Sequence, residues 1–295
     1  MASALRLQVH GAPDDAALAG WREVEDEFAT TEAALSRFLP DSELTIVNRE
    51  AGRGVPRPVG ERLYRAVATA DRARRTTGGR FDARVLAALE RLGDAGTPLP
   101  AAGGVKRGSF RRPRGRLIAL DRAYDLGGIG KGLALRWAWR RLATLRTVAS
   151  GVLLEAGGDL VVGGRPETAQ TWSIGVEDPT GGPSPVAVIV PGEGAVCTSS
   201  VARRAWWSPG GLPVHHLIDP ASGLPGGGGL LSVTVASGDP AWAEVWSKAL
   251  FLAGPRGIGD LARGRGLAAW WVDLEGGLAM TPAARQRTAW TADQG

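Results

Sequence analysis

The sequence predicts a mixed fold of helices and strands, on three observations. Several stretches place apolar residues at helical spacing, and several short runs are rich in valine, isoleucine and leucine. The 43 glycines gather where these stretches end, without a repeat period. Hydrophobic residues make up 44% of the chain and charged residues 22%, which is ordinary for a globular protein. A length of 295 residues allows one large domain or two lobes around a sizeable core.

Charge and cysteine content exclude some classes of function. The net charge is +5 and the pI is near 10.1, but basic residues are scattered and interleaved with acidic ones, which argues against a nucleic-acid binder. Cys197 is the sole cysteine, so an intrachain disulfide and a cysteine metal cluster are excluded. No apolar run reaches the roughly 18 residues of a membrane span. The N-terminus lacks the pattern of an export signal, so we expect a cytoplasmic protein, or an exported one if a leader precedes this sequence.

The N-terminal third predicts one strand and a series of helices. A strand is expected over 5–9 and an acidic, alanine-rich helix over 15–35. Ser42 follows a proline turn and can cap a short helix. Residues 56–77 form a second amphipathic helical pattern, which the Gly78-Gly79 pair ends.

Asp82 lies between this glycine break and a further helical pattern over 83–93. A carboxylate in such a place can cap the helix, and on these residues alone capping and ligand binding are both open. Residues 97–115 are rich in proline, glycine and arginine and are expected to form a surface loop. A strand is expected over 116–121.

The most informative stretch is Asp125-Leu126-Gly127-Gly128-Ile129-Gly130-Lys131-Gly132. Four glycines in eight residues are typical of a tight turn, and the apolar positions after them predict a helix that continues to Leu145. A glycine-rich turn at a helix N-terminus leaves backbone N–H groups for an anion such as phosphate. Asp125 could cap the helix, bind a ribose hydroxyl or help to hold a cation. A helix start without a ligand is the plain alternative.

The C-terminal half predicts mainly strands. A hairpin is expected over 152–164, with its turn at Gly157-Gly158-Asp159. Further strands are expected over 172–176, 186–190 and 230–237, and a last strand with its turn over 267–276. His215 and His216 lie close to Asp219 in a loop that is typical of an active site, although a structural role for the histidines is open as well.

A helix is expected over 241–252, where Glu244 and Lys248 stand four residues apart and share a face. An ordinary exposed ion pair would give the same spacing. The chain has only three lysines among its 35 basic residues, however, and they are Lys106, Lys131 and Lys248. Two of the three therefore lie in segments that other observations already single out.

Six segments in this order resemble those of the FAD:protein FMN transferases, the ApbE family. They are SRFLPDSELTIVN, GRFD, DLGGIGKG, EAGGDL, HLIDPASGLP, and SVTV with the helix after it. Each segment is weak alone, but together they cover nearly the whole chain and indicate one ApbE-like domain over 1–295. The sequence departs from the family at Ala83, where proline is usual, and at Glu155, where asparagine is usual.

The resemblance implies a two-lobed α+β fold, with mixed and antiparallel sheets flanked by helices and an FAD cleft between the lobes. It implies that FAD is the substrate, and that its FMN half passes to a threonine or serine hydroxyl of an acceptor flavoprotein as a phosphoester, with release of AMP. It also implies help from Mg²⁺. Such a reaction needs charge neutralised on the departing AMP and an acceptor hydroxyl that is positioned and deprotonated.

The matching motifs also imply roles for single residues. His216 is implied as general base, because an imidazole pKa of about 6.5 suits proton transfer near neutral pH. Asp219 would orient His216 or fix its loop. The residues implied to contact FAD are Phe38, Arg80, Phe81, Asp82, Asp125, Gly127, Gly128, Lys131, Thr198, Ser199 and Ile218.

The implied metal site departs from the family pattern. The carbonyl of Gly128 and the carboxylate of Glu244 would hold Mg²⁺, but Lys248 stands where a metal-binding threonine is usual. A protonated amine cannot ligate a cation, so we hypothesise that the Lys248 ammonium takes the ion's place, held by Glu244. Lys248, and the lack of the family's M-G-T segment before the first strand, leave two alternatives open. They are an FAD-binding module or chaperone without transfer activity, and an FAD pyrophosphate hydrolase.

Overall fold

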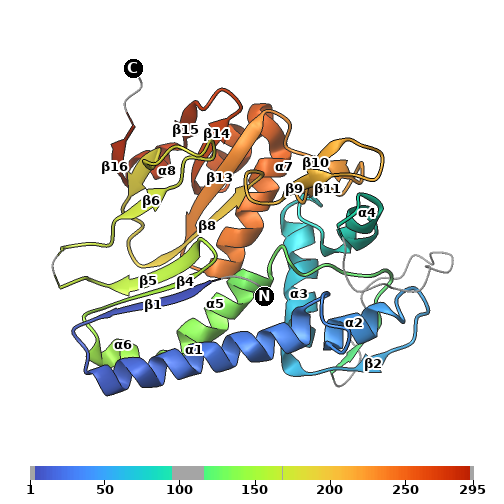
Figure 1. Cartoon of the computed structure of the whole chain (residues 1–295), viewed down its shortest axis with the longest axis horizontal. Coiled ribbons are helices and arrows are strands. Elements are labelled where there is room, and N and C mark those ends of the chain that lie inside the picture. The colour runs from blue at the N-terminus through green and yellow to red at the C-terminus, as the bar shows by residue number, and fades with distance from the viewer. Residues whose placement is uncertain (1–3, 95–115, 168, 293–295) are drawn as a thin grey trace.

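The computed structural model describes residues 4–94, 116–167 and 169–292, and its centre is a seven-stranded sheet (Figure 1). Neighbouring strands in the order β1-β4-β5-β8-β13-β14-β15 are all antiparallel. These strands are β1 (Leu5–His10), β4 (Gly151–Ala156), β5 (Asp159–Gly164), β8 (Gly194–Ser200), β13 (Leu230–Ser237), β14 (Ala268–Asp273) and β15 (Leu278–Met280). A large antiparallel sheet with flanking helices confirms the expected α+β class.

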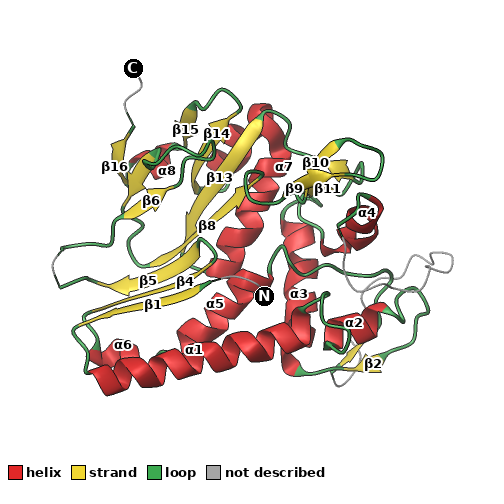
Figure 2. Cartoon of the chain, viewed as in Figure 1, coloured by secondary structure: helices red, strands yellow, loops and turns green. Residues whose placement is uncertain are grey.

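Helices cover one face of this sheet (Figure 2). They are α1 (Asp14–Leu35), α5 (Gly130–Arg141), α6 (Leu145–Val148) and α7 (Pro240–Gly264). Leu135 of α5, Ala243 of α7 and Val152 of β4 belong to one buried apolar cluster between the helices and the sheet. Cys197 of β8 lies in the same cluster, fully buried, with its Sγ 3.5 Å from the carbonyl oxygen of Pro240. The sheet and α7 are thus in direct contact at the start of that helix.

A smaller sheet and a short helix cover the opposite face. They are β16-β7-β6, formed by β6 (Ile174–Val176), β7 (Ala187–Ile189) and β16 (Thr288–Thr291), and helix α8 (Pro282–Arg285). Trp270 of β14 is fully buried here, and its indole N–H donates to the hydroxyl of Thr288 over 2.9 Å. Burying a tryptophan with its N–H satisfied anchors the small sheet on the large one.

A further group of helices lies beside the sheet. It consists of α2 (Glu43–Asn48), α3 (Glu61–Thr76), the 3₁₀ turn η1 (Ala83–Val85), α4 (Leu86–Arg91) and the ribbon of β2 (Arg57–Pro58) with β3 (Leu117–Ile118). Leu63, Val67 and Ala70 form the buried face of α3, as the sequence predicts. These side chains belong to an apolar cluster that also includes Leu126 and Ile129 of the glycine turn. This apolar cluster therefore fixes the position of the glycine turn relative to α3.

Predicted caps and turns are confirmed at three places. The Ser42 hydroxyl accepts the Thr45 N–H over 3.0 Å at the start of α2, and Asp82 caps η1 by accepting the Arg84 N–H over 3.0 Å. The Gly157-Gly158 turn joins β4 to β5, and both glycines have positive φ.

Several element bounds differ from the prediction, among them the end of α7, which is expected at residue 252 and lies at Gly264. The helix expected from residue 56 begins at Glu61, because Arg57–Pro58 pair with β3 instead. The strand expected over 116–121 is reduced to that pairing partner, Leu117–Ile118. The helix expected to reach Leu145 ends at Arg141, where Ala143 turns back to the carbonyl of Arg140, and α6 follows. The loop expected over 97–115 lies outside the described residues.

Two short ribbons complete the fold on the side of α4 (Figure 1). They are β9 (Ala205–Trp207) with β10 (Pro213–His215), and β11 (Ile218–Asp219) with β12 (Leu224–Pro225). Within the described ranges, no helix combines the length and the hydrophobicity that crossing a bilayer requires.

Candidate active site

One pocket brings together most of the predicted site residues. Its walls come from five parts of the chain: residues 80–89, the glycine turn with Asp125, Arg204 before β9, residues 216–218, and the middle of α7. The predicted residues that line it are Arg80, Phe81, Asp82, Asp125, Gly127, Gly128, His216, Ile218 and Lys248. Cationic, acidic and imidazole side chains therefore converge with glycine backbone in one place.

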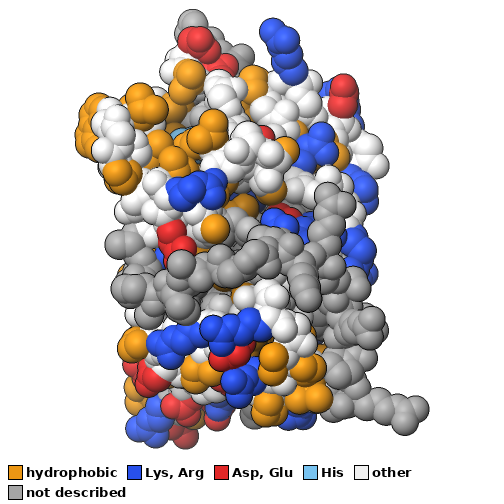
Figure 3. Space-filling view, turned by 90° about the vertical axis from the view of Figure 1, so that its right-hand side faces the viewer, with side chains coloured by type: hydrophobic (Ala, Val, Ile, Leu, Met, Phe, Trp, Pro, Cys, Tyr) orange, Lys and Arg blue, Asp and Glu red, His pale blue; other side chains and the backbone are white. Residues whose placement is uncertain are grey.

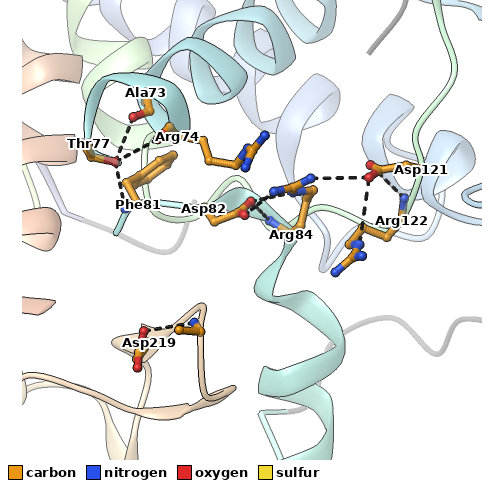
Figure 4. A network of polar contacts seen from close by, with 10 residues as sticks. Ala73, Arg74, Thr77, Phe81, Asp82, Arg84, Asp121, Arg122 and Asp219 are labelled. Atoms are coloured by element: carbon orange, nitrogen blue, oxygen red, sulfur yellow. Dashed lines mark hydrogen bonds and ion pairs between the residues drawn. The ribbon is translucent and has the colours of Figure 1, made fainter. Parts of the chain in front are cut away.

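The end of α3 positions Phe81 in this pocket (Figure 4). The Thr77 hydroxyl donates to the Ala73 carbonyl over 2.9 Å and accepts the Phe81 N–H over 3.0 Å. Gly78 and Gly79 have φ of 63° and 84°, which side chains rarely adopt, so the glycine pair makes this turn possible. Phe81 is only 4% exposed as a result.

Asp82 is held by a neighbouring arginine (Figure 4). The Arg84 guanidinium donates from Nε to Asp82 over 2.8 Å and also pairs with Asp121 over 3.4 Å. The hydrogen bond with Asp82 raises the pKa of Arg84, so the guanidinium stays charged. Asp82 thus acts as a cap, as predicted, and lies at the pocket wall as well.

A buried asparagine fixes the entry to the glycine turn. The Asn48 side-chain amide donates to the Tyr124 carbonyl over 2.8 Å, and its oxygen accepts the Tyr124 N–H over 2.9 Å. The next residue, Asp125, donates its N–H to the Ala83 carbonyl over 2.7 Å and accepts the Gly127 N–H over 2.7 Å. The Asp125 carboxylate therefore stabilises the conformation of the glycine turn, and the Asp125 N–H links the turn to residues 80–83.

The protein supplies its own carboxylate at the N-terminus of α5. The Gly132 N–H donates to Oε2 of Glu244 over 2.8 Å, and Glu244 is 1% exposed. A Cβ at Gly132 would lie 2.5 Å from the Pro240 carbonyl oxygen, so this glycine lets α5 approach α7 closely. The helix N-terminus does attract an anion, as expected, but at Gly132 that anion is Glu244.

Lys248 lies against the glycine turn. Its Nζ is 3.3 Å from Oε1 of Glu244, and a Cβ at Gly128 would lie 3.2 Å from both Cε of Lys248 and Cε2 of Phe81. Each oxygen of Glu244 therefore already has a partner from the chain. Across the described ranges, no three His, Cys, Asp or Glu side chains gather as a metal site. The residues present do not fit the divalent ion that the resemblance implies.

His216 lies in the pocket wall with its Nδ1 3.3 Å from the Arg204 carbonyl oxygen. Burial, followed by the charges of Lys248 and Arg204, lowers the pKa of His216 from 6.5 to about 3. The ring is therefore neutral at physiological pH and able to accept a proton, although its pKa is not the ordinary value expected from sequence. Asp219 accepts the Ala221 N–H over 3.0 Å and the Ser222 hydroxyl over 3.1 Å, so its contacts fix the loop (Figure 4).

Two residues predicted to contact FAD, Lys131 and Thr198, are not among the residues that line this pocket and take part in a polar network with Asp159. Lys131 pairs with Asp159 over 2.5 Å, and Asp159 accepts the Thr198 N–H over 3.0 Å. Burial opposes the charge of Lys131, but the nearby carboxylates of Asp159 and Glu244 prevail and raise its pKa.

Two more predicted FAD contacts also lie off the pocket wall. The hydroxyl of Ser199 is 2.8 Å from that of Ser247, and both are buried between β8 and α7. Phe38 is 54% exposed, with the Arg37 guanidinium 4.2 Å from its ring centroid. Neither Ser199 nor Phe38 lines the pocket in this structure.

Sequence reasoning missed a buried ion-pair chain that joins two pocket walls. Arg37 is 4% exposed, and its guanidinium lies 2.9 Å from Asp94 and 3.5 Å from Asp125. Asp94 also pairs with Arg204, which lines the pocket. Arg37 lies inside the SRFLPDSELTIVN segment, so the sequence already singled out the segment but not this residue. Asp94 and Arg204 carry no comparable sequence signal.

Comparison with known proteins gives consistent matches. The model of the ApbE family matches residues 1–271. A protein of Klebsiella pneumoniae (strain 342) named FAD:protein FMN transferase is 26% identical over 288 residues, which cover 92% of this chain and 81% of the relative. One of Treponema pallidum (strain Nichols) with the same name is 29% identical over 251 residues, which cover 76% and 68%.

Solved structures match over nearly the full length. The crystal structure of the ApbE protein from Thermotoga maritima has a TM-score of 0.82 at 25% identity, covering 98% of this chain and 96% of that one. The flavin transferase ApbE from Vibrio cholerae has a TM-score of 0.80 at 20% identity, covering 97% and 96%. At that identity the Vibrio structure supports the fold alone.

Proposed function

The chain belongs to the ApbE family, and we propose on that premise that it transfers the FMN half of FAD to an acceptor flavoprotein. The observation that carries this proposal is the pocket in which His216, Lys248 and the glycine turn meet. The acceptor hydroxyl, from a threonine or serine, would attack the phosphorus on the FMN side. The bond from that phosphorus to the AMP oxygen breaks, AMP leaves with the electron pair, and the hydroxyl proton goes to His216.

His216 suits the role of base once FAD is present. Its pKa is low because burial and two neighbouring cations disfavour the imidazolium. A bound diphosphate would bring negative charge close to the ring and raise that pKa towards neutrality. The proton affinity of His216 would then be highest in the complex that reacts.

The positive charge on the leaving-group side would come from the chain itself. We propose that the Lys248 ammonium, held by Glu244 against the glycine turn, serves where the resemblance implies Mg²⁺. Arg80 and Arg204 line the same pocket and can pair with phosphate oxygens. Fixed cations that line the pocket would stabilise the charge that develops on AMP.

The test is to incubate the protein with FAD and candidate flavoprotein acceptor domains, and to follow flavin fluorescence on the acceptor in denaturing gels. A labelled acceptor and equimolar AMP support transfer. AMP and free FMN without label would indicate a hydrolase, and tight FAD binding with neither product would indicate a binding module. His216→Ala should abolish transfer and keep FAD binding, whereas His10→Ala, on the outer strand β1, should leave both unchanged.

A second comparison isolates Lys248. Transfer by the wild-type chain should continue in EDTA, and Lys248→Met should lower its rate at least about 100-fold, in line with the loss of one preorganised charge. Isothermal titration of Mg²⁺ into the protein should give no heat. A wild-type chain that binds Mg²⁺ and needs it for transfer would contradict the role of Lys248 while leaving the transferase function intact.

A further inference from the structure

A hairpin leaves the pocket wall and returns to it. Arg204 and His216 both line the pocket, and the chain between them runs outwards as β9 and back as β10. The hairpin therefore begins and ends beside the proposed general base. A protein that presents a hydroxyl to His216 would therefore reach a site at the base of this hairpin.

The inner face of the hairpin holds it firmly on α4. Trp206 and Val214 are cross-strand partners on this face, and Val214 is buried. The Trp206 indole N–H donates to the Leu92 carbonyl over 2.7 Å. At the tip, the Ser208 N–H donates to the Leu212 carbonyl over 2.8 Å. These contacts fix the conformation of the hairpin before any partner arrives.

The outer face of the hairpin is apolar and exposed. Trp207 is 72% exposed, more than any other large hydrophobic side chain in the described ranges, and Leu212, at the tip of the hairpin, is 66% exposed. Trp207 pairs across the strands with Pro213, which is exposed too. Figure 3 shows hydrophobic side chains gathered on the upper part of this side of the molecule, at the height of β9 and β10 in Figure 1.

We propose that this exposed apolar surface, formed by Trp207 and Pro213 on the outer face of the hairpin and by Leu212 at its tip, is the surface on which the acceptor flavoprotein docks. The proposal rests on the proposed function, because only a macromolecular acceptor needs a surface beyond the pocket. A rigid, exposed tryptophan is typical of the residues that dominate binding energy in protein interfaces. The chemistry of the face selects an acceptor with apolar side chains beside its target hydroxyl. FAD needs only the pocket and is bound independently of this face.

The experiment uses the purified full chain and the acceptor domain that the wild type labels in the assay above. Trp207→Ser and Leu212→Ser remove the two exposed side chains. Trp290→Ser on β16 and Leu274→Ser after β14 are matched controls, since these side chains are 47% and 61% exposed on other parts of the molecule. The quantities measured are KM for the acceptor domain, Kd for FAD and the melting temperature.

Trp207→Ser should raise KM for the acceptor at least about tenfold, as expected for a central interface tryptophan. Leu212→Ser should raise it less, and both variants should keep the wild-type Kd for FAD and melting temperature. The two control variants should match the wild type in all three quantities. An acceptor KM within twofold of the wild type for both hairpin variants overturns the docking surface while transfer stands. A wild-type chain that labels no acceptor at all overturns both proposals together.

Discussion

Gly132→Ala tests whether α5 needs a glycine to approach α7. The new Cβ would lie 2.5 Å from the Pro240 carbonyl oxygen and 2.6 Å from Cα of Ala241, whereas ordinary contacts begin at 3.4 Å. Backbone atoms cannot rotate away, so the helices must part by about 0.9 Å, the difference between 3.4 and 2.5 Å. Overpacking of this kind costs about 1–3 kcal/mol, against roughly 1 kcal/mol that alanine contributes to a helix.

The same movement would stretch the hydrogen bond from the Gly132 N–H to buried Glu244, now 2.8 Å long. A weakened partner for a buried carboxylate adds about 1–3 kcal/mol. The net loss is then about 1–5 kcal/mol, which lowers the melting temperature by roughly 2–8 °C for a chain of this size. Differential scanning calorimetry at neutral pH measures this shift.

Gly130→Ala is the matched control, two residues earlier in α5. A Cβ at Gly130 meets nothing within 4 Å, and its φ is not in the left-handed region. Its melting temperature should stay equal or rise slightly. If Gly132→Ala melts as high as Gly130→Ala, the close approach of the two helices is not what the glycine provides, and the reasoning fails.

Three further predictions concern charged groups. Because the pKa of His216 is lowered to about 3, the unfolded chain binds a proton below about pH 6.5 that the folded chain does not, so stability should fall between pH 7 and 5 by up to about 2 kcal/mol. His216→Gln should lose this pH dependence in thermal melts, and an equal slope in both proteins would contradict it. Arg37→Met leaves Asp94 short of a buried partner, so we expect a loss of about 2–3 kcal/mol in urea unfolding and weaker FAD binding by calorimetry. Arg62→Met removes the two hydrogen bonds that this guanidinium donates to the buried carboxylate of Glu27, at 2.7 and 2.6 Å, and should cost a similar amount, whereas adding Glu27→Gln should restore most of it.

Local signals made much of the fold predictable. Ser42 and Asp82 cap helices where their positions indicated, and the Gly157-Gly158 turn joins two strands as expected. Such features depend on hydrogen bonds between residues two or three positions apart, which a sequence displays directly. The reduced strand at Leu117–Ile118 was less predictable, because its length depends on a partner strand about 60 residues away.

The pocket residues that lie in sequence motifs could be predicted. The contacts that form between residues far apart in the chain could not. The sequence pointed to Lys248 and His216, which the structure brings to one pocket. It did not show that Gly132 allows close packing of two helices, because the backbone atoms that a side chain there would meet belong to α7. The Arg37–Asp94 pair could not be predicted for the same reason. Its connection to the pocket depends on Arg204, which pairs with Asp94 and lies more than 100 residues further along the chain.

The buried Cys197 gives the molecule a built-in reporter of its own opening. Burial raises the pKa of this thiol, so it stays protonated and is a poor nucleophile. An alkylating reagent also cannot reach the sulfur while β8 and α7 remain in contact. With a single thiol in the chain, the rate of iodoacetamide labelling measures how often that contact breaks. Because α7 also carries Lys248 into the pocket, a ligand that binds there and stabilises α7 would slow the labelling. Ligand binding could then be detected without any product being formed.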